Sequence, residues 1–325
     1  MRELRYIHAV NEAINEEMER DENVVLIGED IAGPGGAFGA TRGLLERHGP
    51  RRVLDTPISE AGFVSLATGA AMCGLRPIVE IMFMDFTTVC MDSIVNQLAK
   101  IRYMSAGQYC LPVVLRTPAG GGLNAAAQHS QCLEAWFAHV PGLKVVMPAT
   151  PYDVKGLIKS AVRDDNPVLV IEHKGLYAGK GSVPEEEILV PLGKAEIKRE
   201  GSDVTVVATS RMVHDSLEAA CIMAEEGVSV EVLDLRSIQP WDKDAVFNSV
   251  TKTHRLVVAH EAVKSFGIGG EIAATVVEEI MDELDAPIKR VGAPFIPVPY
   301  SLEQFYQPGP THVVEAVRAT MSSIL

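Results

Sequence analysis

The sequence is short of basic residues and has no long apolar run. Its 325 residues include 29 Lys and Arg against 43 Asp and Glu, a formal charge of −14. Nucleic-acid binders need clustered Lys and Arg to meet phosphates, so this balance argues against a nucleic-acid partner and suits a basic protein partner instead. A membrane span needs about 18 to 20 apolar residues in a row, and none is present. Because the start, with Arg2, Glu3 and Arg5, is charged, we expect no signal peptide, no membrane span and a cytoplasmic location.

Cysteine is also scarce. The five cysteines are odd in number and widely spaced, and no two form a C-x-x-C pair: Cys73, Cys90, Cys110, Cys132 and Cys221. This pattern is typical neither of a disulfide framework nor of a zinc site. We therefore expect reduced thiols that act as small core residues.

The usual phosphate-binding motifs are missing as well. The pattern G-x-x-x-x-G-K-[ST] does not occur. Residues 267–272, GIGGEI, resemble a dinucleotide motif but lack its last glycine, which favours a tight packing role where a helix begins. Residues 33–39 are glycine-rich but contain Pro34, which has no amide hydrogen. We interpret them as a flexible loop that could border a site.

Short apolar runs alternate with helical patterns along the first half of the chain. Strands are predicted at 24–28, 78–82, 113–115, 144–147 and 168–171, and helices at 4–20, 63–73, 87–104, 130–139 and 151–163. Thr150 is a plausible cap for the last of these helices, which starts with Pro151. Apolar strands without polar alternation, separated by helices, indicate a parallel sheet covered on both faces.

A second alternation follows a stretch rich in glycine and proline, residues 173–193, which we interpret as a linker. Strands are predicted at 204–208, 228–233, 256–259 and 289–291, and helices at 213–225, 242–250, 270–284 and 312–322. The fold class is therefore α/β, with two open, mostly parallel sheet domains. We place these domains at residues 1–185 and 186–325.

Three polar side chains stand where α/β proteins place their sites. Glu29 follows the first predicted strand, at the edge where open parallel sheets bind ligands, although it could equally be a solvated loop charge. Glu60 stands where a helix begins, and either caps it or, if buried, acquires a raised pKa and shares a proton with a ligand. His129 follows the glycine-rich residues 120–122 and could exchange protons near neutral pH. Ser130 beside it lacks the G-x-S-x-G context of a nucleophile.

Two further residues carry weaker signals. Phe86 ends an apolar strand segment, where an aromatic ring is more often core than a stacking platform. His260 ends a strand of the second domain and is a weak candidate. No two histidines have the spacing of a metal site. The chemistry is therefore predicted in the first domain, and we expect the second to serve assembly.

Several strings taken together resemble one family over essentially the whole chain. They are "VLIGED", "VLDTPISEAG", "LRPIVEIMFMDF", "AAAQHSQCLEAWFAHVPGLKVVMPATPYDV" and "GSDVTVVATSRMVHDSLEAA". They are similar to the β subunit of the thiamine-diphosphate-dependent component of 2-oxo acid dehydrogenase complexes, a family that includes pyruvate, branched-chain 2-oxo acid and acetoin dehydrogenases. The resemblance implies a transketolase-like pyrimidine-binding domain, a transketolase carboxyl-terminal-like domain and an α2β2 heterotetramer.

The resemblance also implies roles for the candidate residues. Glu60 matches the glutamate that hydrogen-bonds the aminopyrimidine ring of the cofactor. Phe86 matches an aromatic residue that lines the cofactor pocket, and His129 matches a histidine that faces the substrate and the incoming lipoyl group. Glu29 matches an acidic residue of a proton relay between distant active sites.

Metal binding is implied at two places. In this family the α subunit holds magnesium and the diphosphate through a G-D-G sequence, which this chain lacks, so the β chain alone should be inactive. Some relatives also bind potassium through oxygen ligands, which suit such a cation. The positions that correspond to this potassium site here are Val113, Ala161, Val162, Asp164 and Asn166. Asp164 and Asn166 could instead form only a polar turn before Pro167.

The expected activity is cleavage of acetoin or decarboxylation of a 2-oxo acid, with acyl transfer to lipoyl on a dihydrolipoyl acyltransferase core. The string "EHKGLYAGKG" slightly favours acetoin over pyruvate and branched-chain substrates. A self-sufficient transketolase-like enzyme and a non-catalytic assembly subunit are the alternatives. We expect acidic residues of the second domain to meet a basic region of the acyltransferase.

Overall fold

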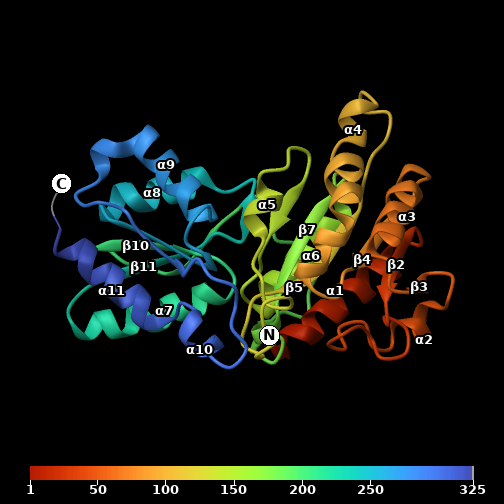
Figure 1. The fold of residues 1–325 in the computed structure, drawn as a ribbon, viewed down its shortest axis with the longest axis horizontal. Coiled ribbons are helices and arrows are strands. Elements are labelled where there is room, and N and C mark those ends of the chain that lie inside the picture. Colours follow the sequence, from red (N-terminus) through yellow and green to blue (C-terminus); the bar gives the residue numbers. More distant parts are fainter. Residues whose placement is uncertain (324–325) are drawn as a thin grey trace. The chain divides into compact units, whose positions relative to one another are not determined.

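The computed structural model describes residues 1–323, and the chain divides into two compact units. The first unit comprises residues 1–119 and 136–192, and the second comprises residues 120–135 and 193 onward. Both are shown in Figure 1. The predicted domain division at residue 185 stays a prediction. None of the helices in residues 1–323 is both long and apolar enough to cross a membrane.

The first unit is built on a parallel sheet. Its strands run in the order β6, β7, β5, β4, β2, β3, and every neighbouring pair is parallel. All residues of β2, β5 and β7 are buried, as expected of a parallel sheet covered on both faces. The predicted sheet is therefore confirmed. The bounds are β2 (Val24–Glu29), β3 (Val53–Thr56), β4 (Arg76–Glu80), β5 (Val114–Ala119), β6 (Lys144–Val146) and β7 (Val168–His173).

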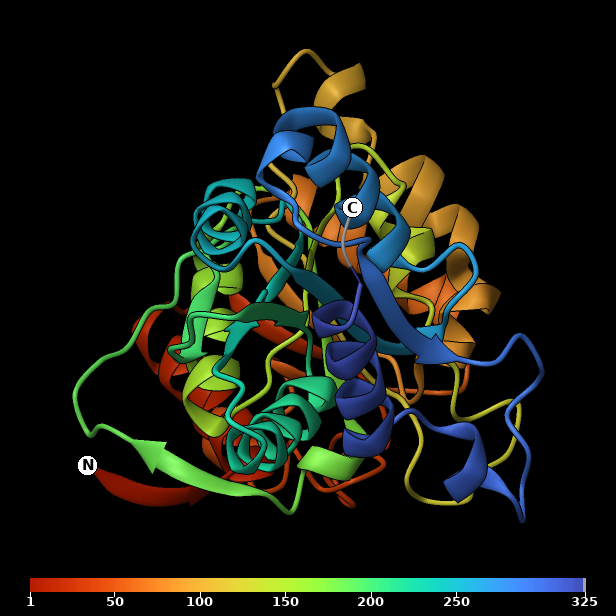
Figure 2. The ribbon, with the colours of Figure 1, turned by 90° about the vertical axis from the view of Figure 1, so that its left-hand side faces the viewer.

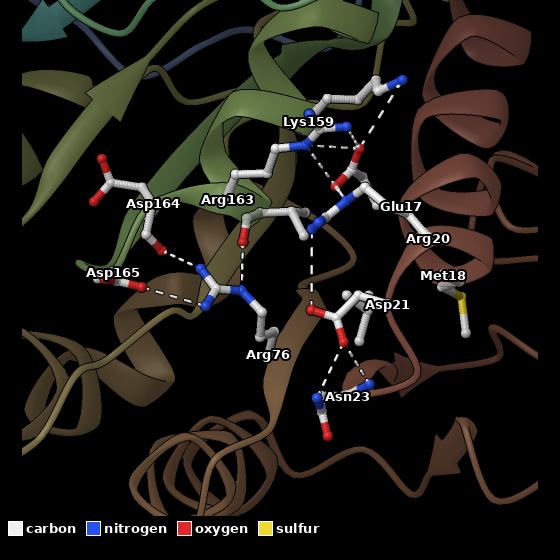
Figure 3. Close-up of polar contacts among 12 residues, drawn as sticks. Glu17, Met18, Arg20, Asp21, Asn23, Arg76, Lys159, Arg163, Asp164 and Asp165 are labelled. Atoms are coloured by element: carbon white, nitrogen blue, oxygen red, sulfur yellow. Dashed lines mark hydrogen bonds and ion pairs between the residues drawn. The ribbon is translucent and has the colours of Figure 1, made fainter. Parts of the chain in front are cut away.

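Two helices pack together beside this sheet, α1 (Tyr6–Arg20) and α6 (Pro151–Arg163). The buried carboxylate of Glu17 on α1 joins them, because Arg163 Nη2 donates to it at 2.7 Å and Arg20 Nε at 2.8 Å (Figure 3). The helix α6 has its predicted bounds, and Thr150 caps it as predicted, accepting a hydrogen bond from Asp153 N at 3.1 Å.

The amino-terminal helix was predicted two residues too long. Residues Arg2–Arg5 form the strand β1, which pairs antiparallel with β8 (Lys180–Val183) (Figure 2). The β8 strand lies inside the segment interpreted as a linker, so that segment is partly ordered. Both strands are short and polar, and no local pattern announces a pairing between residues this far apart in sequence.

The predicted helix 87–104 is broken into three pieces. A 3₁₀ segment covers Met84–Cys90, a π segment Ser93–Leu98, and α4 only Ile101–Met104. Side-chain hydroxyls compete for the backbone here, since Thr87 Oγ1 donates to Met84 O at 2.6 Å and Thr88 Oγ1 to Asp85 O at 2.8 Å. Helix α3 (Glu60–Met72) begins three residues before its predicted start, and α5 covers only Glu134–Ala138.

The second unit has its own mostly parallel sheet, as predicted. Its order is β14, β13, β10, β11, β9, with only β9 antiparallel. Helices α7 and α11 pack against each other on it (Figures 1 and 2). The strands are β9 (Glu196–Arg199), β10 (Val204–Ala208), β11 (Val230–Asp234), β13 (Leu256–Val263) and β14 (Lys289–Ala293). The other elements are α7 (Arg211–Glu225), β12 (Ser237–Gln239), α8 (Lys243–Thr253), α9 (Ile268–Ile280), α10 (Glu303–Tyr306) and α11 (Pro310–Met321).

A buried ion cluster joins three adjacent strands of the first sheet. Arg116 on β5 is 1% exposed and donates to both carboxylate oxygens of Glu172 on β7, at 2.8 and 2.7 Å. Its remaining nitrogen contacts Glu80 on β4. The hydroxyl of Tyr177 donates to Glu172 at 2.7 Å. A single guanidinium group thus serves as the counter-ion of two buried carboxylates.

The glycine-rich loop after β2 packs directly on this cluster. A side chain at Gly36 would overlap the carboxylate of Glu80, and Gly36 N donates to Asp30 O at 2.8 Å. Because Gly36 has φ of +79°, this position suits only glycine. The segment interpreted from sequence as a flexible loop is therefore hydrogen-bonded and packed.

Replacing Arg116 by Met should lower the free energy of unfolding by about 3–5 kcal/mol, because two buried carboxylates lose their counter-ion. Urea denaturation followed by circular dichroism measures it. Arg51→Met, at an exposed position, is the matched control. Equal stabilities for the two variants would contradict a structural role for the cluster.

Candidate active site

Two buried carboxylates meet at the carboxyl edge of the first sheet. Glu29 is the last residue of β2 and is 4% exposed, and Glu60 is the first residue of α3 and is 5% exposed. Ser59 N, just before α3, donates to Glu29 Oε1 at 3.3 Å. Strand β3, which precedes α3, is a parallel neighbour of β2, so both residues come from the edge where open α/β sheets bind ligands.

The surroundings of Glu29 favour its protonated form. Burial raises the pKa of Glu29, and the neighbouring charges of Glu60 and Asp30 raise it further against the opposing hydrogen bond from Ser59 N. Burial, with added repulsion from Glu60 and Glu29, raises the pKa of the Cys90 thiol to about 12. A thiol with that pKa stays neutral at physiological pH and is a poor nucleophile.

Of the two carboxylates, Glu60 is the one whose oxygens form no hydrogen bond or ion pair with the described part of the chain. Within residues 1–323, no hydrogen bond or ion pair to its side chain is present, whereas Glu29 accepts from Ser59 N. The Glu60 oxygens keep some exposed surface, so they are free to hydrogen-bond a ligand that reaches them. The sequence left helix capping and ligand binding open for Glu60, and the first turn of α3 contains no cap bond to it.

Phe86 belongs to an aromatic cluster on the same unit. Its ring is half-buried and lies 5.5 Å from that of Phe83, edge to face, and Phe83 lies 5.6 Å from Phe38 in the glycine-rich loop. Phe86 lies in the same 3₁₀ segment as Cys90, whose pKa is raised in part by the charges of Glu60 and Glu29. The core interpretation and the platform interpretation therefore overlap, because the ring packs on Phe83 and still keeps part of its surface open.

His129 lies in the second unit, in the segment 120–135 that this unit takes from the middle of the chain. Its side chain is half-buried, and His129 N donates to Ala126 O at 3.4 Å. Glycines at 120 and 122 and the non-glycine residues Asn124 and Ala126 all have φ between +51° and +96°. The loop that presents the histidine is thus held in a conformation that ordinary residues rarely adopt.

A cavity of about 350 Å³ borders this loop within the second unit. Burial raises the pKa of Tyr306 at its wall to about 12. Just after the loop, burial raises the pKa of Glu134 to about 7, with a smaller contribution from Glu261. Sequence patterns gave no signal for these groups, since they come from separate elements. The walls are Ala127, Ser130–Leu133, Glu261–Val263, Phe295–Val298, Tyr306 and Gln307.

His260, the weak sequence candidate, is a core residue. Its ring is fully buried, and burial lowers its pKa to about 4. Side chains at Gly267 or Gly269 would crowd the ring, and α9 begins at Ile268. The predicted packing role of residues 267–272 where a helix begins is therefore confirmed, and His260 is the residue they pack against.

Three of the five residues predicted to hold potassium have oxygens that contact cationic side chains, and the carbonyls of the other two, Val113 and Ala161, accept from backbone amides. Arg76 donates to Val162 O and to Asp164 O, both at 2.8 Å (Figure 3). Lys144 pairs with the Asp164 carboxylate, and Arg102 donates to Asn166 Oδ1 at 2.9 Å. Asp164 also accepts from the Asn166 backbone and side chain, both at 2.8 Å, which is the polar turn considered from sequence.

The wider surroundings of this turn hold no acidic metal cluster. Burial opposes ionisation of Asp164, but its hydrogen bonds from Lys144 and Asn166 keep the pKa of the carboxyl below its usual value. Across residues 1–323, no group of three or more His, Cys, Asp or Glu side chains is arranged to bind a metal ion.

Comparison with known proteins resolves the family. Residues 2–180 match the pyrimidine-binding domain of transketolase, and residues 193–313 match the transketolase C-terminal domain. The chain is 50% identical to the acetoin:2,6-dichlorophenolindophenol oxidoreductase subunit beta of Bacillus subtilis, over 94% of both chains. It belongs to the transketolase-like β subunits of 2-oxo acid and acetoin dehydrogenases. The resemblance seen in the sequence is confirmed.

Other members of this β-subunit family are nearly as similar. The 2-oxoisovalerate dehydrogenase subunit beta of Bacillus subtilis is 46% identical, over 97% of this chain and 98% of the relative. The mitochondrial pyruvate dehydrogenase E1 component subunit beta of Rattus norvegicus is also 46% identical, over 97% and 89%. The family consists of oxidoreductase components and uses thiamine diphosphate.

A solved structure supports the fold. A split-gene transketolase, described as an inactive beta4 tetramer, matches with a TM-score of 0.82 over 99% of both chains at 24% identity. The predicted transketolase-like α/β fold is confirmed.

Proposed function

We propose that this chain is the β subunit of an α2β2 thiamine-diphosphate-dependent dehydrogenase component, in which it supplies proton-handling groups to a site completed by an α subunit. The observation that carries the proposal is the Glu60 carboxyl group, which is buried beside Glu29 with unused bonding capacity. Such a group fits the ring nitrogen of an aminopyrimidine, to which a carboxyl group donates a hydrogen bond.

Each remaining site residue has a task that suits its position. Thiamine diphosphate, when bound, supplies a carbon that attacks the substrate carbonyl and stabilises negative charge. Glu60 hydrogen-bonds the pyrimidine end of the cofactor, and beside it lies Glu29, whose pKa is raised by burial and by the charge of Glu60. Phe86 offers an aromatic surface for the ring, and His129 donates a hydrogen bond to developing negative charge on the substrate or lipoyl group.

The diphosphate end requires a partner. The chain contains no G-D-G sequence, and residues 1–323 hold no acidic metal cluster. We therefore assign magnesium and diphosphate binding to the α subunit. The acyl acceptor is lipoyl on a dihydrolipoyl acyltransferase core, whose basic surface would meet the acidic second domain.

Acetoin is the substrate we favour. Two relatives named as acetoin oxidoreductase β subunits are 50% and 49% identical to this chain, against 46% for relatives named for 2-oxoisovalerate and pyruvate. The difference is small and agrees with the string "EHKGLYAGKG" after β7. A panel of acetoin, pyruvate and branched-chain 2-oxo acids on the reconstituted pair decides the order.

Glu60→Gln tests the catalytic role. In the reconstituted pair, turnover should fall roughly 10²- to 10⁴-fold, because the amide cannot exchange the proton that a carboxyl group transfers. Stopped-flow or steady-state reduction of an artificial acceptor measures it. Glu46→Gln is the matched control, since Glu46 is an exposed glutamate in the first turn of α2 (Leu44–His48). Unchanged turnover in Glu60→Gln would favour the non-catalytic assembly subunit.

The most detailed part of the proposal is that a potassium ion binds at the residues predicted from the sequence. Four of the five predicted residues lie at 161–166 and the fifth, Val113, lies just before β5. Each carbonyl has a second lone pair, but an ion bound at 161–166 must share its oxygens with Arg76, Arg102 and Lys144. If it binds, the melting temperature in KCl should exceed that in NaCl at equal ionic strength by roughly 2 °C or more. The difference should vanish in Asp164→Asn. Equal melting temperatures in both salts would mean that the three side chains alone hold the turn.

A further inference from the structure

The loop that carries His129 contains strained backbone and two long backbone hydrogen bonds. In this loop, residues 120–131 and hereafter the histidine loop, Gly120 N donates to Gln131 O at 3.5 Å and His129 N donates to Ala126 O at 3.4 Å, and both bonds are long. Asn124 and Ala126 have φ of +51° and +60°. Such backbone persists only where surrounding groups over-determine it.

Two carboxylates from distant elements of the second unit supply that support. Glu303, the first residue of α10, accepts from Gly122 N at 3.1 Å and also from Asn124 N. Glu261 on β13 accepts from Gly121 N at 2.7 Å. Hydrogen bonds to an ionised acceptor are stronger than those between neutral groups, and Glu303 is only 2% exposed.

The two carboxylates are themselves held in place. Gln307 Nε2 donates to Glu303 Oε1 at 3.3 Å. Arg211 Nη1 donates to Gln307 Oε1 and also lies 3.8 Å from Glu261 Oε2. A side chain at Gly121 would overlap both Gln307 and Glu303. The loop backbone therefore fits closely against this framework, and a side chain at position 121 would displace the ends of Gln307 and Glu303.

We propose that Glu303, assisted by Glu261, is a positioning residue that sets the conformation of the histidine loop and hence the orientation of His129. Glu303 and Glu261 lie in the part of the chain that matches the transketolase C-terminal domain, whereas His129 lies in the part that matches the pyrimidine-binding domain. The C-terminal-domain part of the chain thus sets the conformation of a loop that the pyrimidine-binding-domain part supplies. The catalytic consequence rests on the proposed function, but the structural one does not.

Hydrogen exchange of the full chain tests the structural part. In Glu303→Gln, one amide oxygen replaces two charged acceptors, so exchange at Gly122 and Asn124 should accelerate roughly tenfold or more. Glu279→Gln, an exposed glutamate on α9, should leave the loop unchanged. Gly121→Ala is an independent variant that keeps both carboxylates and should accelerate the same amides, because its methyl group overlaps Glu303 and Gln307 and pushes them away from the loop. Unaltered exchange in both variants would overturn the proposal.

Kinetics of the reconstituted α/β pair test the consequence for His129. Glu303→Gln should lower kcat roughly ten- to hundredfold at an unchanged melting temperature, with a smaller effect on KM, because a misplaced donor fails mainly in the transition state. Glu303→Asp, which keeps the charge, should recover part of kcat. His129→Ala is measured alongside. Loss of kcat in His129→Ala but not in Glu303→Gln would overturn positioning.

The same experiment separates the two proposals. If exchange accelerates in Glu303→Gln while kcat is unchanged in both Glu303→Gln and His129→Ala, Glu303 positions the loop as proposed and the catalytic role assigned to His129 is wrong.

Discussion

One buried guanidinium sets the geometry of the first unit. Arg116 joins β4, β5 and β7 through Glu80 and Glu172, at the carboxyl end of adjacent parallel strands. The glycine-rich loop packs on Glu80 through Gly36, so the cluster also fixes the position of the loop that leaves β2. A buried ion pair adds little net stability over apolar packing, but it strongly penalises any displaced partner. It therefore opposes any shift of β5 against β4 and β7, and β4 is the strand that pairs with β2, which ends at Glu29.

Sequence patterns predicted the elements whose signal is local. The central strands are continuous apolar runs, and the pair Thr150 and Pro151 predicts where α6 begins. The signal fails where structure depends on distant partners, as in β1, whose polar residues pair with β8. It also fails over residues 87–104, where apolar periodicity suggested one helix but threonine hydroxyls bind the backbone and divide it.

The candidate site obeys the same rule. Glu29 could be placed at a sheet edge from its predicted strand. That Glu60 lies beside it depends on β3 (Val53–Thr56), a short strand that no apolar run predicted and that pairs with β2. Their coupling and the unused capacity of Glu60 depend on burial, which the sequence leaves open. The support of the histidine loop by Glu303 could not be predicted, since 181 residues separate Glu303 from Gly122. His260 resembled a site residue only because its burial by Gly267 and Gly269 is invisible in sequence.

The account depends on a site divided between two chains, with this chain supplying the pyrimidine end and an α subunit supplying magnesium and diphosphate. The most direct measurement is turnover of the purified chain with thiamine diphosphate, magnesium and substrate, before and after addition of the α subunit. The account predicts no turnover by the chain alone and activity that rises with α subunit to a one-to-one ratio. Thiamine-dependent turnover by the chain alone would contradict it.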